Sequence, residues 1–166
     1  MKFESIIEMP CLLTGLWKRF SVHLFEGKVT LADMAEIEER SEKWHDKIRG
    51  KLVEMVVIFP SDAKMTSEER SKMTRIIKRW ESSRVASATV ILAQGLTGAM
   101  HRSVLTGMQL VVPAPHPVKV FGNTADAVKW LAPHVRELCG PEATPEALDA
   151  GVVELSQRFA AREKKS

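Results

Sequence analysis

The sequence predicts an α/β fold: a mixed, largely parallel sheet with an antiparallel N-terminal hairpin, helices packed on the sheet and an appended C-terminal helix. The first observation is a continuous apolar run, Leu52–Phe59, which stops at Pro60. A second run of this kind covers Val85–Ala93. Parallel strands that are covered on both faces read as unbroken Val, Ile and Leu. The third observation is that helical periodicity separates these runs, as crossover helices require.

The N-terminal segment predicts two antiparallel strands, Phe3–Met9 and Leu12–Val22, which are joined tightly around Pro10. Gly15 within the second strand is typical of a β-bulge. The next segment, His23–Val29, is compatible with a third short strand or with a turn into the first helix. Mixed sheets commonly combine antiparallel and parallel strands in this way.

Two amphipathic helices are predicted around the first apolar run, over Leu31–Arg49 and Ser67–Ser82. Thr30 and Thr66 precede them as N-caps, each with an acidic residue three positions later, which is the capping-box pattern. The positions expected to face the sheet are Leu31, Met34, Ile37, Trp44 and Ile48 in the first helix, and Met73, Ile76, Ile77 and Trp80 in the second.

The C-terminal half continues this alternation. Its predicted elements are a helix over Leu96–Gln109, a strand over Val118–Phe121, a helix over Ala125–Leu138 and a final helix over Thr144–Arg162. Pro133 is expected to kink the helix Ala125–Leu138 or to end it early. We therefore expect one α/β domain over residues 1–140 and a helical extension over residues 141–166.

Composition narrows the function classes. The 166 residues are 45% hydrophobic, which is enough for one substantial core. The 24 basic and 21 acidic residues are interleaved, so the net charge of +3 indicates a solubilising surface and argues against nucleic-acid binding. No apolar stretch reaches the roughly 18 residues of a membrane span, and no export signal is recognisable. We expect a cytoplasmic protein in which Cys11 and Cys139 are packing residues.

No motif for catalysis, metal binding or nucleotide binding is recognisable. The histidines are solitary in sequence, without a partner at metal-ligand spacing, and no serine lies in a nucleophile elbow. Gly95 and Gly98 open a predicted helix but lack the spacing and the lysine of a P-loop. The sequence therefore predicts a protein that is not an enzyme and that uses no cofactor or metal.

Hydroxyl and amide side chains follow the predicted parallel strands at their C-terminal ends. These candidate ligand-loop or phosphoacceptor residues are Ser61, Thr66, Ser67, Thr97 and Asn123. Ligands of open α/β sheets bind at this edge. The same residue types are ordinary helix caps, and we interpret Thr66 first as a cap.

A family resemblance rests on the segment Val118–Asn123 and on the following Ala127-Val128-Lys129-Trp130-Leu131, together with the order of the elements. Residues 1–138 resemble the SpoIIAA-like proteins of the STAS and Sec14-type superfamily. STAS-type anti-sigma-factor antagonists carry a phosphorylatable serine in an Asp-Ser-Ser-Gly motif after the central strand. The matching segment here, Met65–Glu68, keeps two hydroxyl residues and lacks the aspartate and the glycine.

Two hypotheses for function follow from this resemblance. The first is a non-enzymatic regulatory module that binds a protein partner or a second copy of itself. It predicts a filled core and an exposed apolar or mixed patch around the helix Ser67–Ser82. The second is a carrier or sensor of a small apolar, lipid-like ligand, which requires an apolar cavity. The final helix is open to three roles, as a lid, as a cover of the sheet edge or as a subunit contact.

Overall fold

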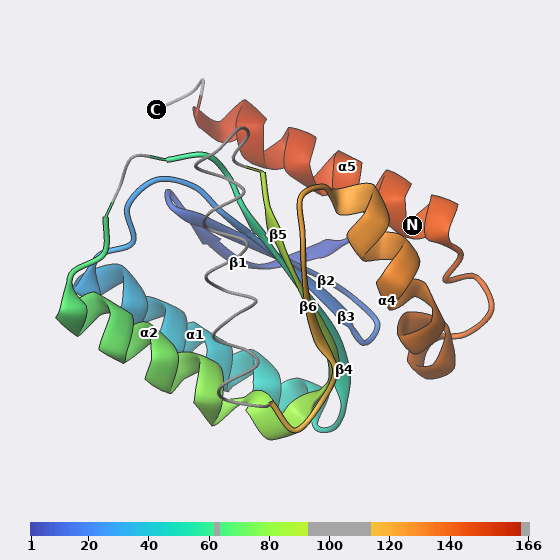
Figure 1. Ribbon diagram of the computed structural model, residues 1–166, viewed down its shortest axis with the longest axis horizontal. Coiled ribbons are helices and arrows are strands. Elements are labelled where there is room, and N and C mark those ends of the chain that lie inside the picture. The colour runs from blue at the N-terminus through green and yellow to red at the C-terminus, as the bar shows by residue number, and fades with distance from the viewer. Residues whose placement is uncertain (62–63, 93–113, 164–166) are drawn as a thin grey trace.

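The computed structural model describes residues 1–61, 64–92 and 114–163, which form one six-stranded sheet with helices on both faces (Figure 1). The strands are β1 (Glu4–Met9), β2 (Leu12–Trp17), β3 (Phe20–Phe25), β4 (Leu52–Ile58), β5 (Arg84–Ile91) and β6 (Val118–Phe121). The helices are α1 (Leu31–Ile48), α2 (Ser67–Arg79), the short 3₁₀ helix η1 (Glu81–Ser83), α4 (Thr124–Cys139) and α5 (Pro145–Glu163). The predicted helix Leu96–Gln109 lies outside the described residues.

The strands lie in chain order from β1 to β6. The pairs β1–β2 and β2–β3 are antiparallel, whereas β3, β4, β5 and β6 pair in parallel. The predicted fold class, a mixed and largely parallel sheet, is therefore confirmed.

The N-terminal strands differ from the prediction in two respects. The predicted strand Leu12–Val22 is two strands, β2 and β3, because the chain reverses in a two-residue turn at Lys18 and Arg19. The bulge lies in β1, where the register shifts between Ser5 and Ile7. Gly15 serves close packing instead, since a Cβ there would lie 2.6 Å from Leu155 Cδ2 of α5.

Helices α4 and α5 lie on one face of the sheet (Figure 1), and a continuous apolar core lies beneath them. Alternate strand residues point into this core because the side-chain period of a strand is two. Its members include Phe20, Val22 and Leu24 of β3, Val53, Met55 and Val57 of β4, Leu131 and Val135 of α4, and Leu148, Val152, Leu155 and Phe159 of α5. The predicted inward stripe of the final helix is confirmed.

The opposite face carries a smaller apolar cluster beneath α1 and α2. It includes Ile7, Leu12, Met34, Ile37, Trp44 and Ile76. The prediction that Ile77 faces inward is wrong, because its side chain is 50% exposed. The inward stripe of α2 runs through Glu69, Met73, Ile76 and Trp80, at spacings of four, three and four, and Ile77 lies about 100° away from Ile76.

The helix ends follow local rules, with one exception. Thr30 and Thr66 each form the predicted capping box, with Asp33 and Glu69 respectively. The prediction that Pro133 ends its helix early is wrong, since α4 continues to Cys139. Pro133 lies on the exposed side of α4, where water can bond the carbonyl group that proline leaves without a donor.

Candidate functional site

The predicted ligand edge lies where β4 and β6 end. Ser61 follows β4, Thr66 and Ser67 begin α2, and all three are exposed. Asn123 is also exposed but follows β6, and β5 lies between β6 and β4. Three of the predicted residues thus belong to the segment that joins β4 to α2 and to the start of that helix, whereas Asn123 follows a strand two positions away in the sheet. Thr97 lies outside the described residues.

Two of these side chains are helix caps. Thr66 Oγ1 accepts a hydrogen bond from Glu69 N at 3.2 Å, and Thr66 N donates to Glu69 Oε2 at 2.6 Å. Asn123 Oδ1 accepts from Asp126 N at 2.8 Å. The interpretation of Thr66 as an N-cap is confirmed.

A buried carboxylate anchors the start of α2. Glu69 is 5% exposed, and Lys28 Nζ lies 3.7 Å from its Oε1. The hydrogen bond from the Thr66 backbone lowers the pKa of Glu69 further than burial raises it. The exposed residues Thr66 and Ser67 are therefore held on a rigid helix start.

A buried polar cluster that no sequence motif predicted lies on the sheet face beneath α1 and α2. We call it the Glu54 cluster, and its members are Thr14 of β2, His23 of β3, Glu54 of β4 and Arg84 of β5. Thr14 Oγ1 and His23 Nδ1 are 3.0 Å apart. His23 Nε2 lies 3.4 Å from Glu54 Oε1, and Arg84 Nη2 donates to that oxygen at 2.8 Å. Arg84 Nε lies 2.7 Å from Glu54 Oε2.

The electrostatics of the Glu54 cluster favour an ionised carboxylate. The Glu54 and His23 side chains are each 13% exposed, and that of Arg84 is 9% exposed. Burial raises the pKa of Glu54, but Arg84 and His23 outweigh it and lower the pKa to about 2. Glu54 and Arg84 therefore form a buried ion pair between two central parallel strands.

Two further histidines lie close to Arg84. The His45 ring stacks between Trp44 and Trp80, with ring centroids 3.9 and 4.0 Å away. Burial, and then the charge of Arg84, lowers the pKa of His45 to about 4. His116 Nε2 lies 2.9 Å from Ser87 Oγ, and burial followed by Arg84 also lowers the pKa of His116.

The described residues around Arg84 do not form a nucleophile–base pair suited to catalysis, and they do not supply a set of metal ligands. Ser87 and His116 resemble a nucleophile and its base, but Ser87 is buried and His116 Nδ1 has no hydrogen-bond partner among the described residues. The described part of the chain also contains no group of three His, Cys, Asp or Glu side chains that could hold a metal. This region therefore supplies the buried Glu54–Arg84 ion pair, the stacked His45 imidazole and the His116 imidazole next to Ser87.

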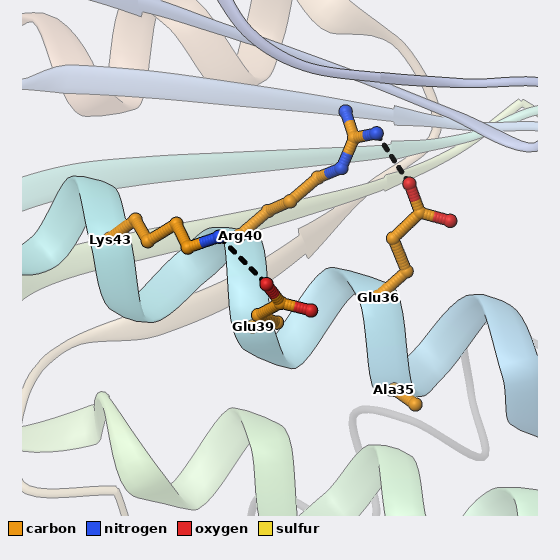
Figure 2. A pocket seen from close by; sticks show the side chains of 5 residues that line it. All are labelled: Ala35, Glu36, Glu39, Arg40 and Lys43. Carbon is orange, nitrogen blue, oxygen red and sulfur yellow. Dashed lines mark hydrogen bonds and ion pairs between the residues drawn. The ribbon is translucent and has the colours of Figure 1, made fainter.

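A hollow on the outer side of α1 is lined by charged side chains (Figure 2). It is formed by Ala35, Glu36, Glu39, Arg40 and Lys43. Lys43 pairs with Glu39 at 2.7 Å, and Arg40 pairs with Glu36. This hollow is open and ionic, which does not suit the apolar ligand of a carrier.

No described helix has both the length and the apolar character that crossing a bilayer requires.

Comparison with known proteins supports the fold. No family model and no curated protein matches the chain. Among solved structures, the chain is similar to an uncharacterised protein of the DUF3478 family with a SpoIIAA-like fold from Shewanella loihica. The identity is 18% and the TM-score 0.52, over 68% of this chain and 83% of that chain. The chain therefore has a SpoIIAA-like fold, as the sequence resemblance predicted.

Proposed function

We propose that the protein is a non-enzymatic regulatory module that acts by binding another protein through the start of α2. The observation that carries this proposal is a run of three exposed residues, Thr66, Ser67 and Glu68, which immediately precede the buried Glu69 in the chain. The capping box holds this run in one conformation, so little conformational entropy is lost when a partner binds it. The SpoIIAA-like fold supports the same function by analogy.

Regulation by phosphorylation would act at Ser67 more readily than at Thr66. Thr66 Oγ1 accepts the capping hydrogen bond, so a phosphate there would disturb the helix start and repel the adjacent Glu69 carboxylate. Ser67 is the first residue of α2, where the helix dipole favours negative charge. A phosphate on Ser67 would add charge to the proposed contact surface without removing the cap.

A photo-crosslinking amino acid placed at position 67 tests the proposal. A matched variant carries the same group in place of Val153, which is exposed on α5. We expect crosslinking in the protein's own cells to join a defined polypeptide to position 67 and not to position 153. Equal products at both positions, or none at position 67, would contradict the proposed contact surface.

A further inference from the structure

A second surface lies at the opposite end of the sheet, where the parallel strands begin. It is built from the β2–β3 turn and the α1–β4 turn, and we call it the basic edge: Lys18, Arg19, Lys47, Arg49 and Lys51. Arg19 Nη1 donates to Ile48 O at 2.6 Å and to Arg49 O at 3.2 Å. These bonds hold the two turns side by side, so their cations form one surface.

Positive charge on the basic edge is only partly neutralised. Lys18 pairs with Glu142 and also donates to Cys139 O at 2.8 Å. Lys51 Nζ donates to Ser82 O at 2.6 Å, a contact that leaves its charge uncompensated. The exposed Lys47 and Arg49 side chains have no hydrogen-bond or ion-pair partner in the part of the chain that the structure describes. Their charges are thus available to an external ligand.

The backbone of the basic edge is left-handed at two positions, one in each turn. Within the described ranges, the non-glycine residues with positive φ are Lys18, at 52°, and Arg49, at 36°. Glycine or asparagine would adopt this backbone more readily, so a long cationic side chain there lowers stability. At position 18 the lysine side chain is used within the protein, since it contacts Glu142 and Cys139. Arg49 ends α1: its N–H donates to His45 O at 3.1 Å, and its carbonyl oxygen accepts from Arg19 Nη1 at 3.2 Å. The backbone at both positions therefore closes the two turns and leaves the Arg49 side chain exposed beside Lys47.

We propose that the basic edge binds an acidic segment of a partner protein, an inference that rests on the proposed function as a protein-binding module. Charge complementarity identifies the partner's chemistry. Single-stranded nucleic acid would call for aromatic side chains that stack on bases, but Trp17 beside Lys18 packs against the apolar core. A membrane surface would call for an exposed apolar anchor, and the large exposed apolar side chains of the described residues, Ile58, Ile77 and Val153, lie outside both turns.

Fluorescence anisotropy of a labelled polyglutamate peptide tests this inference on the full chain. The test variant combines Lys47→Gln with Arg49→Gly, which removes two charges while relaxing the backbone at position 49. The control combines Arg75→Gln with Lys129→Gln, two exposed cations on α2 and α4. We expect the test variant to lose about tenfold in affinity and the control less than about twofold, with weaker binding at higher salt.

Several results would overturn the inference. These are no binding of polyglutamate at low salt, equal losses in the two variants, or tighter binding of a single-stranded oligonucleotide or of phosphatidylserine vesicles through the same cations. Thermal melting verifies that the test variant is folded. Failure of the inference about the basic edge can be distinguished from failure of the proposed function, because crosslinking at position 67 is measured in the chain with Arg49 intact.

Discussion

The two faces of the central sheet belong to the same strands but are stabilised by different interactions. Beneath α4 and α5, every inward strand residue of β3 and β4 is apolar. Beneath α1 and α2, the alternate residues of the same strands include Ser21, His23 and Glu54. The first face gains stability from burial of apolar surface alone. The second also depends on a buried ion pair, and its contribution therefore depends on pH.

The largest expected effect comes from a charge placed in the apolar face. Val57 is fully buried in β4, so Val57→Asp should destabilise the domain by more than about 4 kcal/mol and abolish cooperative folding. Thermal or urea unfolding followed by circular dichroism measures this. The control is Ile58→Asp on the opposite face, where the side chain is 37% exposed and the cost should be small. Cooperative unfolding of the Val57 variant near the wild-type midpoint would contradict the assignment of β4.

Glu54→Gln should produce the next largest effect. It leaves the buried Arg84 guanidinium without a counter-charge, and we expect a loss of about 3 kcal/mol in the free energy of unfolding. The exposed Glu137→Gln is the control. Replacing both partners, as Glu54→Leu with Arg84→Met, should recover part of the loss. A loss below about 1 kcal/mol for Glu54→Gln would indicate that the ion pair is not formed.

Acid should lower the free energy of unfolding over two pH windows, both of which arise from the sheet face beneath α1 and α2. The pKa of His45 is lowered from 6.5 to about 4, so the unfolded chain binds more protons in this range and stability falls as the pH decreases through it. The pKa of Glu54 is lowered from 4.5 to about 2, which extends the loss to lower pH. Urea unfolding at stepped pH should show both windows. His45→Gln should reduce the loss in the upper window, leaving the part that comes from the lowered pKa of His116, and should keep the lower window. An unchanged upper window would exclude His45 as a source.

The smallest effect should come from the cap of α2. Thr66→Ala removes the acceptor for Glu69 N and should cost about 1 kcal/mol. Thr66→Ser keeps the hydroxyl and should unfold close to the wild type. If Thr66→Ala matched Thr66→Ser in its urea midpoint, the capping bond would not contribute to stability.

Features governed by local rules were predictable from the sequence. The apolar runs gave β4 and β5, the Thr-x-x-acid pattern gave both capping boxes, and the periodicity of Leu148, Val152, Leu155 and Phe159 gave the inward face of α5. The turn between β2 and β3 was missed because Lys18 and Arg19 carry no turn signal, although Lys18 adopts a positive φ.

The Glu54 cluster was not predictable because it is assembled from four strands. Thr14, His23, Glu54 and Arg84 are distant in sequence and meet only through the register of the sheet. One signal was present: Glu54 is a charged residue inside an otherwise apolar strand, and such a residue requires a buried partner. The roles of Ser61, Ser67, Thr97 and Asn123 in ligand binding or phosphorylation stay predictions.

The proposed protein-binding function is best tested by native mass spectrometry of the protein purified from its own cells, compared with the denatured mass. We expect no bound small molecule and a second polypeptide that dissociates on denaturation. The Ser67→Arg variant, which blocks the start of α2, should lose this polypeptide. An added mass of about 80 Da per chain would indicate phosphorylation. A small apolar molecule that is released on denaturation would contradict the proposed protein-binding function and identify a carrier.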